Sequence, residues 1–367
     1  MKTKTEIRID KIVWWIPTRK MRDRVRDKML LNNYKIIEQE IAEKRLKLKE
    51  ECRKNGLIYI SHGEYLTKLA QYYRKFPDEF MKEMEEFKKG MDNEDLEYLE
   101  YFMNQIKYAP DGIDIPYLIF DNSSLKFFSK EQEIVYFNED SIYNYLKKEF
   151  GNIDYIKLYL LYFKRGISYL PKYIISKFKN TVCIDGGGYI GDTAIFFSKY
   201  DFSEVYAFEP DIVNFNTAKR NINNYKNKNN IKILNMGIGN ENSKLNLQIN
   251  DFIDAGSSFK KSISDEDKSY TVDVVKIDDY FKDRKNKIGL IKLDIEGFEE
   301  EALIGAEEII KNDKPVLLVA GYHDWVSFKQ MFRIKKWIEN LNLGYKIMFR
   351  QIGYTEILTW CFICYVE

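Results

Sequence analysis

The chain has 367 residues, more than the ~250–300 at which a single core stops growing, so we expect two domains. Its 58 Lys and Arg almost balance its 57 Asp and Glu, and the formal net charge at pH 7 is +1. This balance excludes a strongly basic nucleic-acid-binding protein, and the 45% hydrophobic content excludes a disordered chain. We therefore expect no nucleic-acid partner.

The apolar runs and the cysteine content indicate where in the cell the protein is located. No apolar run approaches the ~20 residues of a transmembrane helix, and the N-terminus lacks the apolar core of a secretory signal. The four cysteines are too few for a disulfide scaffold, so we expect a cytoplasmic protein. Cys361 and Cys364 form a C-x-x-C in an apolar run without a second pair or a nearby His, which favours core packing over a zinc or redox site. We predict no metal site.

Residues 1–155 are predicted to form a mainly helical N-terminal domain. Helical patterns cover Asn33–Arg53, about Glu64–Gln105 and Ser141–Phe178, with a Pro/Gly breaker at Pro110–Pro116 and short strand-like pieces over Ile119–Phe137. Pro171 is placed at the start of the last helix before the second domain. The charged helices offer a surface for homo-oligomer formation.

Residues 156–367 are predicted to form a second domain, in which strands and helices alternate from Asn180 onward. Short β-branched runs alternate with amphipathic helices, the pattern of a mostly parallel sheet. The predicted strands are Thr181–Asp185, Val205–Glu209, Lys232–Met236, Leu290–Asp294, Val316–Ala320, Tyr345–Arg350 and Leu358–Tyr365, the last two antiparallel. The predicted helices are Asp192–Lys199, Asn214–Asn224, Glu299–Lys311 and about Ser327–Leu341.

A glycine loop joins the first strand to its helix. It reads Asp185-Gly186-Gly187-Gly188-Tyr189-Ile190-Gly191, and Asp192 and Thr193 open the helix. Glycines let the backbone approach a ligand, but the spacing also fits NAD enzymes. Asp185 would repel a pyrophosphate, whereas S-adenosylmethionine carries an ammonium, a sulfonium and no phosphate. We therefore predict S-adenosylmethionine as the cofactor of this loop.

Further cofactor contacts are expected along the same edge of the sheet. Glu209 ends the second strand before Pro210, near the ~20-residue spacing at which an acid reaches a ribose, and its carboxylate can accept both ribose hydroxyls. Gly237 follows the third strand and is placed along the adenine. Ser257 and Ser258 lie in a long polar insertion and are candidate hydrogen-bond donors.

Four side chains are candidates for the chemical step. Lys292, Asp294 and Glu296 alternate with apolar residues at the end of the fourth strand and would project to one side if extended. They can serve as base, electrostatic guide or metal ligand, or can form an ion-paired strand end. Lys292 can orient a substrate or pair with one of the acids, and Asp294 is also a candidate cofactor contact. His323, just past the fifth strand, has an ordinary pKa suited to a general base. We assign no role to His62.

The combination of motifs resembles the FkbM family of S-adenosylmethionine-dependent methyltransferases. The matching segments, from about Leu160 onward, are Asp185–Thr193, Glu209-Pro210, Gly237–Gly239, Ile277–Tyr280, Ile291–Gly297 and Tyr322-His323. The resemblance implies a class I methyltransferase fold, Rossmann-like, with a seven-stranded, mostly parallel sheet. It also implies O-methylation, commonly of sugars or polyketide-like acceptors.

The segment Lys11–Pro17 resembles, more loosely, a leader on bacterial surface-glycan enzymes. Together these features favour an O-methyltransferase that acts on a sugar or sugar-derived group, in a small molecule or a glycan, during surface-polysaccharide biosynthesis. Two alternatives stay open: an NAD-dependent sugar-nucleotide oxidoreductase or epimerase, and a non-catalytic scaffold that binds a cofactor.

Overall fold

A seven-stranded sheet forms the centre of the computed structural model, which describes residues 57–61, 64–108, 117–121, 164–225, 230–248, 269–323, 329–351 and 360–367. The sheet order is β11-β12-β10-β9-β3-β4-β5. These strands are β3 (Val182–Gly186), β4 (Glu204–Phe208), β5 (Ile231–Leu234), β9 (Ile288–Leu293), β10 (Val316–Ala320), β11 (Lys346–Gln351) and β12 (Trp360–Tyr365). Six of the seven strands run in the same direction, and β12 runs in the opposite direction between β10 and β11.

This topology confirms the predicted fold class. All seven predicted strands are present within two residues of their expected ends, and the last two pair antiparallel as expected. The chain winds outward from β3 through β4 to β5 and then returns to the other side of β3 through β9 and β10. Ligands of such sheets bind where the winding direction reverses, which here is the carboxyl end of β3 and β9.

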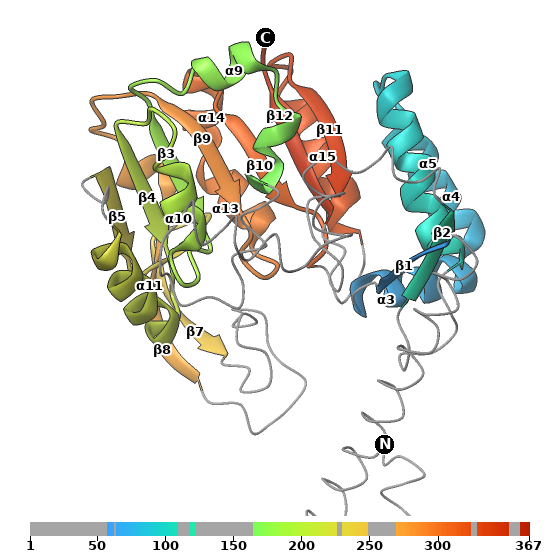
Figure 1. The fold of residues 1–367 in the computed structure, drawn as a ribbon, viewed down its shortest axis with the longest axis horizontal. Coiled ribbons are helices and arrows are strands. Elements are labelled where there is room, and N and C mark those ends of the chain that lie inside the picture. Colours follow the sequence, from blue (N-terminus) through green and yellow to red (C-terminus); the bar gives the residue numbers. More distant parts are fainter. Residues whose placement is uncertain are drawn as a thin grey trace, which may run out of the picture.

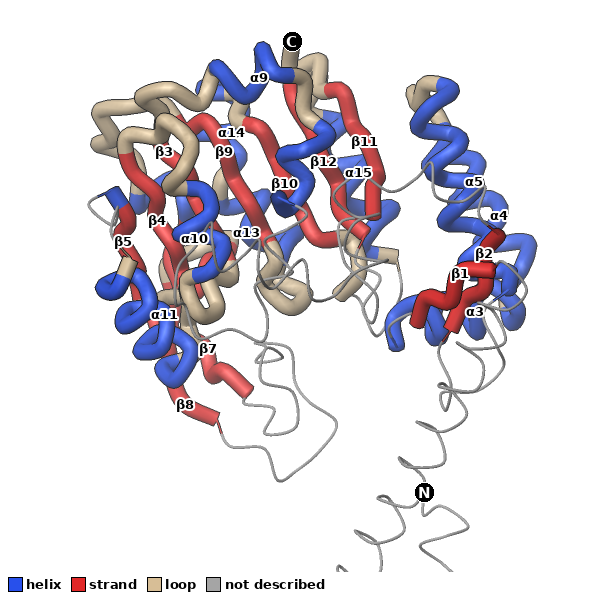
Figure 2. Tube along the Cα trace, viewed as in Figure 1, coloured by secondary structure: helices blue, strands red, loops and turns tan. Residues whose placement is uncertain are grey.

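Helices cover both faces of the sheet, so the domain has three layers (Figures 1 and 2). One face packs against α9 (Lys172–Ser176), α10 (Asp192–Phe197) and α11 (Ile212–Asn224). The other packs against α12 (Ile277–Tyr280), α13 (Glu299–Gly305), α14 (Glu307–Asp313) and α15 (Gln330–Asn340). Alternate side chains of each strand supply the two cores: Cys183 and Leu290 face α10, and Ile184 and Ile291 face the opposite layer.

Two details of the second domain differ from the sequence prediction. The predicted helix Glu299–Lys311 is two helices, α13 and α14, which meet at Ala306, where φ is −113°. The adjacent Gly305 lies against the backbone of Gly239: a Cβ there would stand 2.0 Å from its carbonyl oxygen. A small second sheet, in the order β6-β8-β7, was not predicted. Its strands are β6 (Gly237–Gly239), β7 (Ser243–Gln248) and β8 (Ser269–Lys276).

The N-terminal region contributes helices, as predicted. These are α3 (Glu64–Lys75), α4 (Pro77–Lys88) and α5 (Asn93–Tyr108), with a strand pair β1 (Leu57–Ser61) and β2 (Tyr117–Asp121); the 3-10 helix η2 (Lys164–Tyr169) follows. Helix α4 lies beside α15, and helix α5 lies beside β11 (Figure 1). Phe87 and Phe102 contact Phe349 edge-on, and buried Arg350 pairs with Asp95 at 2.5 Å. The helices therefore share one core with the β11 edge of the sheet.

Several predictions for the N-terminal half fall on residues outside those described. They are the boundary between residues 155 and 156, the helical stretch Asn33–Arg53, the segment Lys11–Pro17 and His62. The two-domain division and self-association through these helices stay predictions.

Cys361 and Cys364 do not form a common site. They are three residues apart on β12, so their side chains enter the cores on opposite faces of the sheet, and both are buried. Both thiols therefore fill apolar cores, in line with the core-packing interpretation. Among the helices of the described ranges, none is long and apolar enough to cross a membrane.

Candidate active site

The glycine loop turns sharply between β3 and α10, and its backbone N–H groups bond to the protein itself. Gly187 and Gly188 donate to the Phe208 carbonyl at 3.0 and 2.9 Å, and Gly191 donates to the Gly188 carbonyl at 2.7 Å. The Tyr189 N–H donates to the Glu209 carboxylate at 2.7 Å. Loops that bind pyrophosphate direct such N–H groups at the ligand. This loop instead uses at least four of them to hold its own shape.

Gly187 is required where it stands. Its φ is +77°, and a Cβ on it would lie 1.9 Å from the Asp294 carbonyl oxygen. A side chain there would therefore separate the loop from the end of β9. This close approach brings the turn after β9 against the glycine loop, so the two predicted halves of the site are in contact.

Asp185 lies beneath the loop, where Lys292 neutralises it. The two residues are direct neighbours in the register of β3 and β9, and Lys292 Nζ is 3.0 Å from Asp185 Oδ1. The same ammonium donates to the carbonyls of Gly186 and Gly187 at 2.9 and 2.8 Å. Thr193 at the start of α10 donates to Asp185 Oδ2 at 2.6 Å. Both charged side chains are almost fully buried.

This pair corrects the electrostatic reasoning made from the sequence. Asp185 was expected to present its negative charge to the ligand, but the adjacent ammonium balances that charge and the side chain has no exposed surface. Lys292, a candidate for the chemical step, is placed here as a brace that ties β9 to the loop carbonyls. Of the two roles predicted for it, orienting a substrate and pairing with an acid, the geometry displays the second.

Glu209 lies at the end of β4 with its carboxylate buried next to the loop. One oxygen accepts the Tyr189 N–H at 2.7 Å, and the other accepts the Asp211 N–H at 2.9 Å. Burial raises the pKa of Glu209 to about 8, against the effect of these two N–H groups. Each carboxylate oxygen has a second lone pair, so both can also accept a hydroxyl. The fit to the two hydroxyls of a ribose is therefore good.

The residues around Glu209 fix the position of its carboxylate. Pro210 follows it, and Asn235 donates from one side-chain nitrogen to the carbonyls of Glu209 and Pro210, both at 2.9 Å. Asp211 caps α11 by accepting the N–H groups of Val213 and Asn214. The carboxylate therefore belongs to a rigid strand-to-helix turn.

Asp294 and Glu296 follow β9 on the other side of the glycine loop. Tyr322 donates its hydroxyl to Asp294 Oδ1 at 2.6 Å. The predicted alternation beyond the strand does not hold: β9 ends at Leu293, and Glu296 has a φ of +53° in a turn. Burial raises the pKa of Glu296 to about 7. An acid that titrates near neutrality is well matched to accept a proton.

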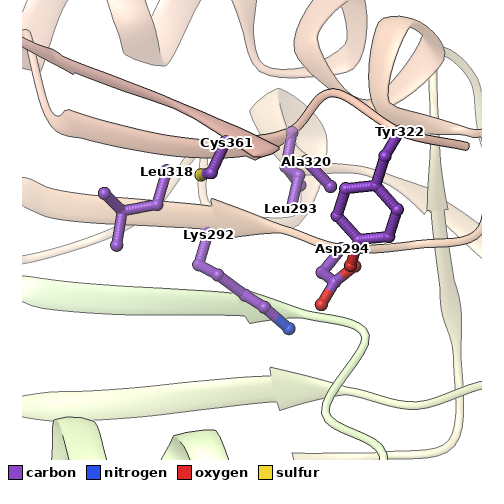
Figure 3. A pocket seen from close by; sticks show the side chains of 7 residues that line it. All are labelled: Lys292, Leu293, Asp294, Leu318, Ala320, Tyr322 and Cys361. Atoms are coloured by element: carbon purple, nitrogen blue, oxygen red, sulfur yellow. The ribbon is translucent and has the colours of Figure 1, made fainter. Parts of the chain in front are cut away.

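A small pocket opens at the same carboxyl ends of β9 and β10 (Figure 3). Figure 3 shows the polar ends of Asp294 and Tyr322 meeting, while the Lys292 side chain extends toward β3, where it pairs with Asp185. The lining residues are Lys292, Leu293, Asp294, Leu318, Ala320, Tyr322 and Cys361.

His323 is fully enclosed by acids. Its Nδ1 is 2.7 Å from Oε1 of Glu299, the first residue of α13, which has no exposed surface. Its Nε2 is 3.5 Å from Asp294 Oδ1 and 3.7 Å from Glu296 Oε1. Burial alone would lower the pKa of His323, but Glu296, Glu299 and Asp294 raise it to about 10. The imidazole is therefore protonated at neutral pH, which removes the reason for reading it as a base.

The structure brings most of the predicted residues to one edge. Asp185, the loop from Gly186 to Thr193, Glu209, Lys292, Asp294, Glu296 and His323 are linked by the contacts above, and Gly237 begins β6. Ser257 and Ser258 lie outside the described residues. The sequence reading missed Glu299, since it is the first of three consecutive glutamates and only burial distinguishes it.

Comparison with known proteins identifies the domain. Residues 185–347, which span this whole edge, match the family described as the methyltransferase FkbM domain. The chain carries an FkbM methyltransferase domain. S-adenosylmethionine is its cofactor, as predicted, and the buried, doubly N–H-bonded carboxylate of Glu209 fits that cofactor's ribose. The match favours a methyltransferase over the alternative of an NAD-dependent oxidoreductase or epimerase.

The solved structures that match the chain are distant in sequence. The methyltransferase FkbM from Methylobacillus flagellatus is 20% identical with a TM-score of 0.38, covering 63% of this chain and 60% of that one. An rRNA methylase from Streptococcus thermophilus is 9% identical with a TM-score of 0.35, covering 53% and 93%. SMU.1697c from Streptococcus mutans, solved with S-adenosylhomocysteine, is 10% identical with a TM-score of 0.33, covering 53% and 93%. No curated protein matches the chain.

Among the described residues, no three His, Cys, Asp or Glu side chains are grouped so as to hold a metal ion. His323, Asp294 and Glu296 instead approach one another at ion-pair distances.

Proposed function

We propose that the methyltransferase domain transfers a methyl group to a hydroxyl of a sugar or sugar-derived group in surface-polysaccharide biosynthesis. S-adenosylmethionine supplies the methyl group as an electrophile on sulfur. The acceptor oxygen forms a bond to the methyl carbon as the sulfur–carbon bond breaks, and the hydroxyl proton passes to a carboxylate of the protein. S-adenosylhomocysteine and a methyl ether are the products.

The observation that carries the proposal is the presence of two carboxylates, Asp294 and Glu296, directly beside the cofactor loop. A hydroxyl is a weak nucleophile, so O-methylation benefits from a base within hydrogen-bond reach of it. Glu296, with its pKa raised by burial to about 7, is about half ionised at neutral pH and so can both accept and release a proton. Asp294, oriented by the Tyr322 hydroxyl, is the second candidate.

On the cofactor side we propose Glu209 as the ribose acceptor and the loop as the surface against which the cofactor lies. The cofactor set comprises Asp185, Gly186, Gly187, Gly188, Tyr189, Gly191, Asp192, Thr193, Glu209, Pro210, Gly237 and Asp294, with Ser257 and Ser258 as further candidates. Within it Asp185 and Thr193 act through the loop rather than by direct contact, since they bond to each other and to Lys292.

Calorimetry tests the cofactor assignment first. S-adenosylhomocysteine should bind the full chain and NADH should not; binding of NADH alone would refute the assignment. Turnover then tests catalysis: Asp294→Asn and Glu296→Gln should keep S-adenosylhomocysteine affinity and lose methyl transfer. If both variants transfer methyl groups at the wild-type rate, no carboxylate at this edge acts as the base.

The acceptor is tested in the cell. Mass spectrometry should show that glycans from a strain without the enzyme lack one methylene unit relative to the parent strain. Unchanged glycans together with a methylated small molecule would keep the methyltransferase and replace the acceptor. A protein that binds the cofactor and methylates nothing would be the non-catalytic scaffold. The cytoplasmic location and self-association stay predictions.

A further inference from the structure

We propose that Glu299 is a positioning residue that holds His323 as an imidazolium, with its Nε2–H presented to the Asp294 and Glu296 carboxylates. The proposal deepens the proposed function, because it assigns the proton positions at the edge where the acceptor hydroxyl would lose its proton. In this arrangement His323 is the charged partner of the base, and the base is Asp294 or Glu296.

The hydrogen bonds of Glu299 fix its charge. Its Oε1 accepts the backbone N–H groups of Ile295 and Gly297 at 3.0 and 3.3 Å, and its Oε2 accepts the side-chain N–H of Gln330 at 2.9 Å. Both oxygens therefore accept hydrogen bonds from donors, which favours the ionised form of the carboxyl. Although burial acts to raise the pKa of Glu299, His323 and these donors lower it.

An ionised Glu299 in turn determines where the protons of His323 lie. Nδ1, at 2.7 Å from an acceptor-only oxygen, must carry a proton. Nε2 faces Asp294 Oδ1 at 3.5 Å and Glu296 Oε1 at 3.7 Å. Two carboxylates beside one buried nitrogen favour a proton there as well. The ring is then charged at both nitrogens.

The imidazolium has a definite effect on the base. Burial acts to keep a carboxyl neutral, and the adjacent Asp294 and Glu299 also raise the pKa of Glu296, whereas His323 lowers it. Without the cation, Glu296 would hold its proton to higher pH and would be less available to accept one from a hydroxyl. Glu299 therefore acts on the reaction through His323, with no contact to cofactor or acceptor required.

The chain contains only two histidines, which makes the protonation state directly measurable. In proton–nitrogen NMR of the imidazoles, His62→Gln removes one of the two rings and leaves His323 assigned. Wild-type His323 should carry protons on both nitrogens throughout the neutral range. In Glu299→Gln its pKa should fall by about 1–3 units, the effect of removing an opposite charge within reach.

Glu300→Gln is the matched control. Glu300 is the next residue, and its carboxylate pairs with Arg333 at the surface rather than with His323. The pKa of His323 should be the same in this variant as in the wild type. An unshifted His323 in Glu299→Gln, or a wild-type His323 that is neutral at pH 7, overturns the proposal; the second result needs no variant and stands even if Glu299→Gln fails to fold.

A kinetic comparison separates positioning from simple structural support. Glu299→Gln should lower kcat by about 10-fold or more, since a proton-transfer group contributes ~10²–10⁴. Its affinity for S-adenosylhomocysteine should stay within about twofold, and the loss of kcat should grow above the lowered pKa of His323, where the neutral ring no longer lowers the pKa of Glu296. Because the NMR titration uses neither methyl donor nor acceptor, its outcome is independent of whether the acceptor is a sugar hydroxyl.

Discussion

Replacement of Lys292 by Met tests whether this residue braces the fold or serves the reaction. The substitution keeps the length of the side chain but leaves the Asp185 carboxylate, which has no exposed surface, without its cation at 3.0 Å. It also removes the donor to the Gly186 and Gly187 carbonyls. Loss of one partner of a buried ion pair costs about 3–5 kcal/mol. That is a large part of the ~5–15 kcal/mol that stabilises a typical protein.

The assay is denaturant unfolding of the full chain, followed by fluorescence and circular dichroism. Adding Asp185→Asn to Lys292→Met should recover about 1–3 kcal/mol relative to the sum of the two single effects, because the uncompensated charge is removed. Lys311→Met, which breaks exposed pairs with Glu307 and Glu308, should leave the midpoint unchanged. Full stability of Lys292→Met, or strict additivity in the double variant, would refute the bracing role.

Three further predictions concern the cofactor and the base. Glu209→Gln should weaken S-adenosylhomocysteine binding by about 10–100-fold. The affinity of the wild type should rise with pH up to about 8, because the cofactor-free acid must release a proton before it accepts the ribose hydroxyls. Calorimetry in two buffers measures both effects. Wild-type kcat should rise as pH increases through about 7, as Glu296 loses its proton, and Glu296→Gln should abolish this step. Gly187→Ala should weaken cofactor binding more than tenfold. Gly344→Ala is the control, because Gly344 also has a positive φ, +76°, but no atom lies within 4 Å of the new Cβ, and it should retain binding. Equal binding by both variants would show that the contact of Gly187 with Asp294 is unimportant.

The middle of the central sheet was predictable because its strands are short, continuous apolar runs that are rich in β-branched residues. Val182–Gly186 and Val316–Ala320 are buried at every position, and such runs have no other stable place than the middle of a layered domain. The β6-β8-β7 sheet was not predictable in the same way. β6 is buried but only three residues long, and the alternation in β7 (Leu245, Leu247) and β8 (Val272, Val274) spans only two aliphatic residues in each strand.

The candidate site was predictable in position but not in its internal pairing. Strand ends and glycines indicate an edge, since ligands bind at the carboxyl ends of parallel strands. The partner of Lys292 depends on the register between β3 and β9, which are separated by a long stretch of chain. Glu299 was hidden for a similar reason: it precedes Glu300 and Glu301, and only its place against the turn after β9 buries it.

The pairing also changes which residues account for the cofactor. Asp185, the acid first used to argue for a cationic ligand, is balanced by Lys292, and Glu299 is balanced by His323. The charge that remains at the edge belongs to Asp294 and Glu296, whose carboxylate oxygens lie 3.5 and 3.7 Å from His323 Nε2. A donor with an ammonium and a sulfonium is still the ligand that such an edge favours. The electrostatic argument therefore holds, but it rests on the turn after β9 rather than on the acid beneath the glycines.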